Sequence, residues 1–192
     1  MVAPKILVIP GSLRTGSHNA RLAALAAKEL ALAEAEVTRI SLDDYPLPLF
    51  DADLAGTGIP QPALQLKKML MAHQGVFITS PEYSASVTPL LKNTIDWISR
   101  VREGNEPTYA AFRKRVFAIG AAANSGNGGL RSLMALRQIL ELGCGALVIP
   151  EQVSVPRAEQ AFDANDNLKD EAAATALRNA VRRLVELAGM MA

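Results

Sequence analysis

The chain has 192 residues, of which 49% are hydrophobic and 20% are charged, and its formal net charge is +1. This length predicts one domain spanning residues 1–192 with a sizeable core, and the composition excludes a disordered chain. A net charge so close to zero argues against a general nucleic-acid binder, which needs a basic surface to neutralise phosphates.

Membrane, disulfide-bonded and metal-binding proteins are disfavoured by the residue content. No apolar run approaches the length of a membrane span, and residues 3–9 are too few for a signal peptide, so we expect no membrane partner. The lone cysteine, Cys144, lies in an apolar region where buried packing is expected, and it cannot form an intramolecular disulfide. This suits a reducing compartment and makes the cytoplasm the expected location. Only His18 and His73 are present, and no clustered ligand spacing indicates a metal site.

The first element predicted along the chain is a buried strand, the apolar run Ile6–Ile9, which breaks at Pro10-Gly11 into a loop of small polar residues. An alanine- and leucine-rich helix follows over about 17–34. A helix start of this kind directs free backbone N–H groups and a positive dipole end at the loop, which favours a phosphate or another anion.

Side chains of the same loop strengthen this interpretation. Ser12, Ser17 and Asn19 can add hydrogen-bond donors, and Arg14 adds a fixed charge with a fork geometry suited to phosphate oxygens. The loop is neither a dinucleotide fingerprint nor a P-loop, because its glycine spacing is wrong and no Gly-Lys-Ser/Thr follows. The alternative is an ordinary capped turn, in which Ser17 caps the helix and Arg14 is solvated.

The middle of the chain alternates between predicted strands and helices. A short strand at 37–40 precedes the proline-punctuated segment 41–51, which we expect to be irregular, and a helix follows at 62–73. The third strand is predicted at 75–80. A loop at 81–87 then leads to Thr88-Pro89, a capping hydroxyl before a proline at the first helical position, and so to a helix ending near Arg100.

The last third of the chain continues the alternation. The fourth strand is predicted at 114–120, followed by a glycine-rich loop at 121–129 and a helix at 130–142 with Gly143 as its C-cap. A last strand at 146–149 and a polar segment at 152–166 precede a final amphipathic helix that Gly189 ends.

Apolar strands that alternate with helices predict a parallel sheet covered on both faces. With five strands and a site at the first turn, we predict an α/β, flavodoxin-like, doubly wound sheet of order 2-1-3-4-5 with helices on both faces. In this order the loops after the first, third and fourth strands leave the same carboxyl edge, so they would converge on one ligand.

Two motifs taken together, Gly11–Asn19 (GSLRTGSHN) and Pro81–Trp97 (PEYSASVTPLLKNTIDW), resemble the NADPH-dependent FMN reductase family. This family comprises flavodoxin-like enzymes that include chromate, quinone and azo-dye reductases. The resemblance extends through most of the chain, including Asp44–Asp51. It implies FMN as cofactor, NADPH or NADH as hydride donor, a small-molecule electron acceptor, and assembly as a homodimer or homotetramer.

The resemblance also implies roles for individual residues. Ser12, Arg14, Ser17 and Asn19 would hold the FMN phosphate; Pro81, Glu82, Tyr83 and Ser84 would line the isoalloxazine, largely through backbone groups; and the loop at Ser125 and Gly126 would close over the ring from the other side. Two positions depart from the family pattern. Ser84 stands where the family usually has Asn, so a contact to the ring or the ribityl chain is in doubt, and Thr88-Pro89 replaces the more usual Pro-Gly.

The implied chemistry needs no catalytic side chain, because the flavin ring carries the hydride chemistry itself. We expect NAD(P)H to reduce the flavin and leave before a quinone, azo, nitro or chromate acceptor binds at the same face, which is a ping-pong order. Structural interpretations of the same residues are that Tyr83 packs or caps, Glu82 is a solvated loop acid, and Trp97 belongs to the core or a subunit interface. His18 would face solvent.

Two other functions fit the same fold. A flavodoxin-type electron carrier would bind FMN without using a pyridine nucleotide, but such carriers tend to be acidic and this chain is nearly neutral. A regulatory or interaction domain would bind no flavin at all. A receiver domain in particular would need acidic residues at the end of the first strand, where Ile9-Pro10-Gly11 offers none.

Overall fold

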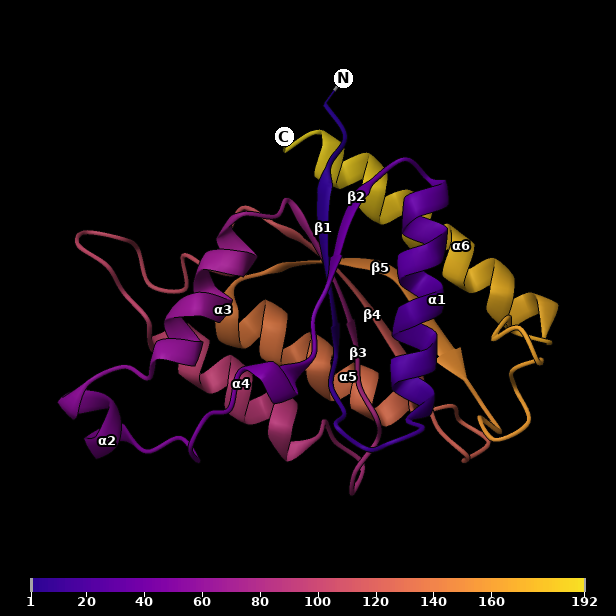
Figure 1. Cartoon of the computed structure of the whole chain (residues 1–192), viewed down its shortest axis with the longest axis horizontal. Coiled ribbons are helices and arrows are strands. Elements are labelled where there is room, and N and C mark those ends of the chain that lie inside the picture. Colours follow the sequence, from indigo (N-terminus) through magenta and orange to yellow (C-terminus); the bar gives the residue numbers. More distant parts are fainter. Residues whose placement is uncertain (1, 192) are drawn as a thin grey trace.

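The computed structural model describes residues 2–191 and contains one five-stranded sheet with the order β2-β1-β3-β4-β5 (Figure 1). Every neighbouring pair of strands is parallel. The strands are β1 (Lys5–Pro10), β2 (Glu36–Arg39), β3 (Gly75–Thr79), β4 (Val116–Ala122) and β5 (Leu147–Val155). The predicted flavodoxin-like fold and its strand order are therefore confirmed.

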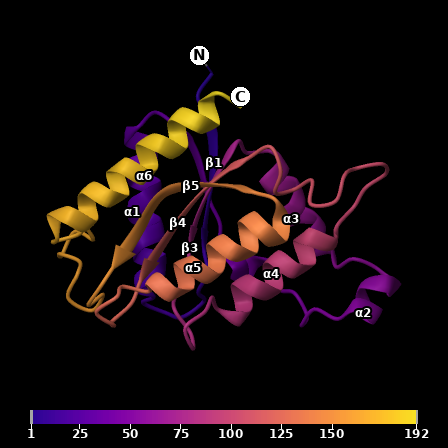
Figure 2. The ribbon, with the colours of Figure 1, turned by 180° about the vertical axis from the view of Figure 1, so that it is seen from behind.

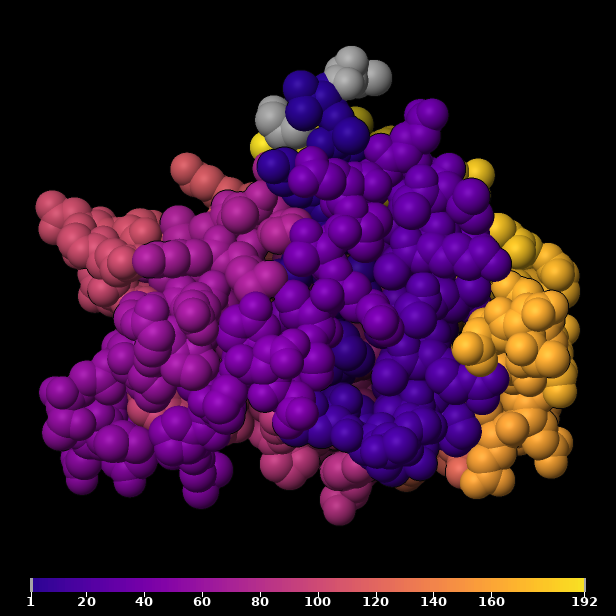
Figure 3. All heavy atoms as spheres, in the orientation of Figure 1, coloured from indigo at the N-terminus to yellow at the C-terminus, as the bar shows by residue number. Residues whose placement is uncertain are grey.

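Helices cover both faces of this sheet (Figures 1 and 2). One face carries α1 (His18–Leu32) and α6 (Glu171–Gly189), and the other carries α3 (Gln61–Met71), α4 (Pro89–Arg100) and α5 (Leu130–Gln138). In the space-filling view, the short helix α2 (Ala52–Thr57) and the loop after α4 protrude on one side (Figure 3). No helix within residues 2–191 is long and apolar enough to cross a membrane.

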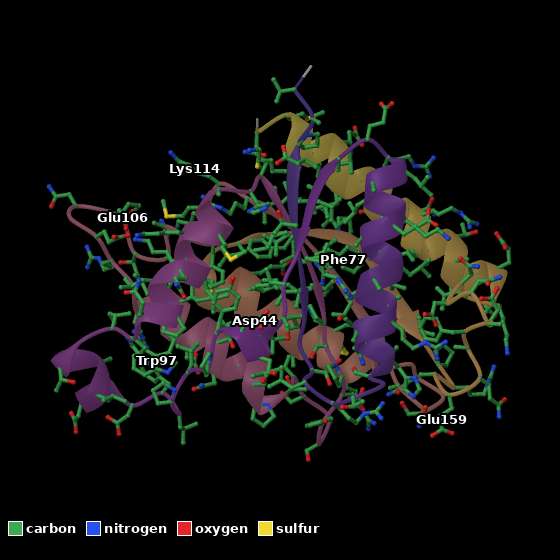
Figure 4. All side chains as sticks on the ribbon, in the orientation of Figure 1. Asp44, Phe77, Trp97, Glu106, Lys114 and Glu159 are labelled. Carbon is green, nitrogen blue, oxygen red and sulfur yellow. The ribbon has the colours of Figure 1, made fainter. Side chains whose placement is uncertain are left out.

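The continuous apolar runs of the central strands follow from these two helical layers. Successive side chains of a strand point to opposite faces. Ile6 and Val8 pack with α1 and α6, whereas Leu7 and Ile9 pack with the α3, α4 and α5 side. Phe77 of β3 lies in the α1 and α6 layer (Figure 4). Neither face of the central strands meets water, so an alternating pattern would be unfavourable.

The last two strands differ from the prediction by two residues or more, and β4 ends at Ala122 and not at 120. β4 begins at Val116 and not at 114, because Lys114 has a left-handed φ of 59° and Arg115 is buried. The Arg115 guanidinium donates hydrogen bonds to the carbonyl oxygens of Leu70, Met71, Ala110 and Arg113. These contacts hold Arg115 against α3 and the preceding loop, and β4 begins at the next residue.

The last strand is also longer than the predicted 146–149, because β5 continues through Gln152 to Val155. Its pairing with β4 shifts register between Phe117 and Ile119, whose partners are Val148 and Gln152. Pro150 lies inside this irregularity, where its missing N–H costs the sheet no hydrogen bond. The prediction that 152–166 is entirely a polar connecting segment was therefore wrong for its first four residues.

Gly143 is not the C-cap of the fifth helix, contrary to the prediction. After α5 the chain makes a π-helical turn over Ile139–Gly143, and the left-handed residue is Gly145, with a φ of 66°. Cys144 lies between them and is buried, as predicted. Burial, with a smaller contribution from the Asp96 charge, raises the pKa of the Cys144 thiol to about 11.

Side chains in the α3 and α4 region have clear structural functions. Trp97 is fully buried, its ring meets Phe50 edge to face at a centroid distance of 5.1 Å, and its indole N–H donates to the carbonyl of Pro48. The interpretation of Trp97 as a core residue is confirmed. The segment 41–51 is irregular apart from a 3₁₀ turn at Leu42–Asp44, and the carboxylate of Asp51 caps α2.

Candidate functional site

The loops after β1, β3 and β4 meet at the carboxyl edge of the sheet and enclose a cavity of about 160 Å³. The residues that line it are Ser12, Arg14, Ser17, His18, Asn19, Pro81, Glu82, Tyr83, Ala122, Ala123 and Asn124. The cavity contains seven of the ten residues expected to bind the cofactor. The sheet order explains this proximity, because β1, β3 and β4 are adjacent strands that end at the same edge.

The loop after β1 is held by hydrogen bonds within itself. The Ser12 Oγ accepts from the backbone N–H of Arg14 at 3.3 Å, and the backbone N–H of Ser17 donates to the Arg14 carbonyl at 3.0 Å. The Ser17 Oγ caps α1 by accepting from the backbone N–H of Ala20 at 3.3 Å. Because both serine oxygens act as acceptors in these contacts, each hydroxyl keeps its proton for donation to a ligand.

Arg14 is exposed and lies over this loop. Its guanidinium donates to the carbonyl oxygens of Thr15 and Gly16 at 3.5 and 3.2 Å. Within residues 2–191 it forms no ion pair with a carboxylate. The cavity therefore has a positive charge at its rim whose partners are neutral, which favours an anionic ligand.

Asn19 has a structural partner. Its side-chain N–H donates to the Ala122 carbonyl at 2.8 Å, and its Oδ1 accepts from the Ala122 N–H at 3.0 Å. The backbone carbonyl of Asn19 accepts from the Thr79 hydroxyl at 2.9 Å. Asn19 is buried, so these bonds fix the first turn of α1 against the ends of β3 and β4.

Glu82 is not a solvated loop acid, because its side chain is only 7% exposed. Its carboxylate forms an ion pair with Arg131 at 2.5 Å, and it also accepts from the backbone N–H of Arg131 at 3.1 Å. Arg131 is the second residue of α5, so the helix start and the guanidinium hold the same carboxylate. The loop after β3 is thereby attached to α5, a contact that the sequence analysis did not find.

Residues 83–86 form a tight hairpin turn. Tyr83 and Ser86 exchange backbone hydrogen bonds of 3.0 and 2.9 Å, and Ser84 and Ala85 between them have left-handed φ values of 48° and 62°. Two positive φ angles in succession define a type I′ turn, which favours Asn and Gly. Tyr83 lines the cavity but is half exposed, while Ser84 does not line it. The backbone conformation at position 84 thus gives the usual Asn of the family a structural reason.

Ser125 and Gly126 do not line the cavity; Ala122, Ala123 and Asn124 contribute that wall. The Ser125 hydroxyl donates to the Asn127 side chain at 2.5 Å, within its own loop. Asn124 is bonded to Glu159 through two contacts, from its side-chain N–H to Oε1 at 2.6 Å and from the Glu159 backbone N–H to its Oδ1 at 3.1 Å. Glu159 comes from the loop after β5, which thus joins the site (Figure 4).

His18 lines the cavity, which differs from the interpretation that its side chain faces solvent. Its Nδ1 is buried and has no hydrogen-bond partner among the described residues. Burial lowers the pKa of His18, and the charges of Arg14 and Arg21 lower it further, while Glu159 opposes them. An unpaired buried polar atom is unfavourable, so His18 lines the cavity at a cost that the described contacts do not offset.

A second cavity of about 220 Å³ adjoins the first, since the two share Ser12, Arg14 and Tyr83. Its remaining lining is formed by Gly11, Leu13, Thr88, Pro89 and Leu90. The Thr88 hydroxyl donates to the Gly11 carbonyl at 2.8 Å and holds the start of α4 against the first loop. A polar cavity beside a more apolar one suits a ligand with a charged tail and a flat ring. Within residues 2–191 no cluster of His, Cys, Asp or Glu could hold a metal ion.

Comparisons with known proteins agree on one family. The family model described as NADPH-dependent FMN reductase matches residues 4–160. An NAD(P)H-dependent FMN reductase of Pseudomonas aeruginosa is 31% identical over 181 residues, which cover 94% of this chain and 92% of the relative. A 2-hydroxy-1,4-benzoquinone reductase from a Burkholderia species is 32% identical over 174 residues, which cover 88% of each chain. The structure of a flavoenzyme NAD(P)H:(acceptor) oxidoreductase from Paracoccus denitrificans matches with a TM-score of 0.79 at 25% identity, covering 98% of this chain and 99% of the other.

Proposed function

The chain belongs to the NADPH-dependent FMN reductase family, and from this we propose that it is a single-domain, NAD(P)H-dependent flavin enzyme that reduces small-molecule electron acceptors. The acceptors we propose are of the quinone, azo, nitro or chromate type. The observation that carries the proposal is the cavity shared by the loops after β1, β3 and β4, which joins Arg14 and two serine hydroxyls to the backbone of Pro81–Tyr83.

We propose that Ser12, Arg14 and Ser17 hold the phosphate of FMN. The chemistry of these donors supports this assignment, because two hydroxyl protons and a guanidinium without a carboxylate partner match the acceptor oxygens of a phosphate monoester. Asn19 contributes by holding the helix start at the end of β4. Its side chain therefore positions the phosphate loop.

The segment Pro81–Tyr83, with Ser84 at its turn, is proposed to lie along the isoalloxazine ring, and residues around Ser125 and Gly126 to face it from the opposite loop. When bound, FMN supplies a ring that accepts hydride from NAD(P)H and passes electrons to the acceptor, in a ping-pong order at one open face. Backbone N–H groups of the loop after β3 would stabilise negative charge on the reduced ring, since Glu82 and Arg131 fix this loop before the reaction.

Solution properties follow from the same family assignment. We propose a homodimer or homotetramer in the cytoplasm, with no nucleic-acid or membrane partner. Measuring the molar mass by light scattering during gel filtration tests the assembly, and a mass equal to one 20.5 kDa chain would contradict it.

The experiment that tests the activity is purification with and without added FMN, followed by NADH and NADPH oxidation with a quinone and with an azo dye. We expect a yellow protein, steady turnover, and parallel double-reciprocal plots when both substrates are varied. A protein that binds FMN but does not consume NAD(P)H with any acceptor would instead be an electron carrier. A colourless protein that binds no flavin would favour a regulatory domain.

A further inference from the structure

His18 has an environment that neither helix formation nor core packing explains. It is the first residue of α1, it lines the cavity beside Arg14 and Ser17, and its buried Nδ1 has no partner within residues 2–191. The other histidine, His73, behaves as a structural histidine: its Nδ1 lies 2.6 Å from the Met69 carbonyl, one turn earlier. Leaving a buried polar atom unpaired is unfavourable, so His18 differs from His73 in that no described residue offsets the burial of its Nδ1.

Charged groups reach His18 from three segments. Arg14 on the first loop and Arg21 on α1 both disfavour a second positive charge, whereas Glu159 on the loop after β5 favours it. Glu82 and Tyr83 line the same cavity. The Glu82 carboxylate is already paired with Arg131, and the Arg21 guanidinium is paired with Asp166. Among the described residues, Glu159 is therefore the acidic group whose charge raises the pKa of His18, and it is bonded to the lining residue Asn124.

These surroundings set the protonation state of the free protein. Burial, and then Arg14 and Arg21, lower the pKa of His18 from its ordinary value of 6.5, so the imidazole is neutral at pH 7. A phosphate monoester brings close to two negative charges at neutral pH. Placed beside Arg14, it would offset the repulsion from Arg14 and Arg21, which adds to the effect of burial, and it would offer the imidazole an acceptor in the cavity that His18 lines.

We propose that His18 takes up a proton when a phosphate monoester enters the cavity and then donates a charge-assisted hydrogen bond to it. The inference rests on the proposed FMN site and adds a phosphate-sensing residue to it. The sign of the pH effect follows directly. A group that binds a proton with the ligand makes the ligand bind more tightly as pH falls. FMN affinity should therefore decrease with rising pH, by up to about tenfold per pH unit, between the pKa of His18 in the free protein and in the complex.

The test is calorimetric titration of the flavin-free protein with FMN at several pH values, each in two buffers of different ionisation enthalpy. The difference between buffers gives the number of protons bound on association. His18→Phe keeps an aromatic ring without a titrating nitrogen, and His18→Asn keeps a polar group that does not titrate in this range. Free FMN titrates identically in all titrations, so subtracting a variant's proton number from that of the wild type gives the protons whose uptake depends on His18.

We expect the wild type to bind up to about one proton more than either variant near pH 6.5, and its FMN affinity to depend more steeply on pH. Riboflavin lacks the phosphate and should show no such difference. His73→Gln, which can still donate to the Met69 carbonyl, should retain the wild-type proton uptake. Equal proton numbers in wild type and His18→Phe, or equal uptake with riboflavin and FMN, would overturn the inference and leave the proposed flavin site intact. Failure of the wild type to bind FMN at any pH would reject both.

Discussion

Asn19 and Ala122 are joined by two hydrogen bonds, of 2.8 and 3.0 Å, between a side-chain amide and the backbone N–H and carbonyl of one strand residue. The amide completes the hydrogen bonding of β4 at the point where the sheet ends. It also brings the first turn of α1 to the cavity, so the loop after β1 is positioned by a residue 103 positions away from Asn19 in the chain.

Asn19→Ala should destabilise the fold, because the buried N–H and carbonyl of Ala122 lose their partners together. We expect a loss of about 1–3 kcal/mol in the free energy of unfolding, measured by urea denaturation. Asn179→Ala makes the same change at an exposed position of α6 and should cost less than about 0.5 kcal/mol. Equal effects of the two substitutions would show that the Ala122 contacts contribute little.

Arg14→Ala should weaken FMN and leave riboflavin unaffected, since the guanidinium is expected to contact only the phosphate. Loss of a charge-assisted hydrogen bond predicts an increase in the FMN Kd of about 10- to 100-fold. Fluorescence titration of the flavin measures both constants, and Arg178→Ala on the exposed face of α6 is the control. An unchanged FMN Kd would mean that the phosphate lies elsewhere.

Arg131→Ala should loosen the loop after β3, because the carboxylate of Glu82 loses the guanidinium and keeps only the backbone N–H of residue 131 as a donor. We expect a loss of about 1 kcal/mol or more in stability and faster proteolysis within residues 81–87. Arg183→Ala removes an ion pair to Glu186 on the surface of α6 and should change stability by less than about 0.5 kcal/mol. Protease resistance equal to that of the wild type would argue that the ion pair does not restrain the loop.

Ala85→Gly should stabilise the protein, because the left-handed φ of 62° at this position is unfavourable for a side chain with a Cβ. We expect a gain of about 0.5–1 kcal/mol in urea denaturation, and Ser84→Asn should act in the same direction. Ala176→Gly, inside α6, makes the same chemical change and should instead cost about 1 kcal/mol. If both glycine variants are destabilised, the hairpin is not strained.

The ion pairs that attach the loop after α4 to α3 should make the free energy of unfolding depend on pH. Lys67 of α3 has a buried side chain and forms ion pairs with Glu103 and Glu106. Glu106 lies on the loop after α4 (Figure 4). The hydrogen bond from Lys67 lowers the pKa of Glu106 below its ordinary value of 4.5. A lowered carboxyl pKa stabilises the fold above the unfolded value and loses that effect as pH falls through the folded one.

Glu106→Gln is therefore expected to be less stable than the wild type at pH 7 in urea denaturation. The difference should shrink as pH falls below 4.5 and disappear once pH lies below the lowered pKa of Glu106, where the wild type is protonated in the folded state too. A stability difference that persists unchanged to pH 3 would contradict the assigned ion pair.

Much of the fold follows from local sequence patterns. Buried strands such as Ile6–Ile9 have no polar residues because helices cover both faces, and Thr88-Pro89 predicts the start of α4 through capping and a fixed φ. Boundaries fail where distant contacts override the pattern. The apolar residues that follow Lys114 predict a strand from position 114. The strand begins only at Val116, because the Arg115 side chain is bonded to carbonyl groups on α3 and on the preceding loop.

Local patterns were enough to specify the order of strands and helices and the loops that carry polar residues, because these depend on periodicity and on the backbone preferences of Pro, Gly and capping residues. Which of those side chains are free to meet a ligand depends on contacts that form only in the folded chain. Among the described residues, Arg14 has no carboxylate partner, Asn19 is bonded to Ala122, Glu82 is paired with Arg131, and His18 lines the cavity with an unpaired buried Nδ1. The physical reason is that a polar side chain's function depends on its partners, and partners far apart in the chain meet only when the sheet has formed.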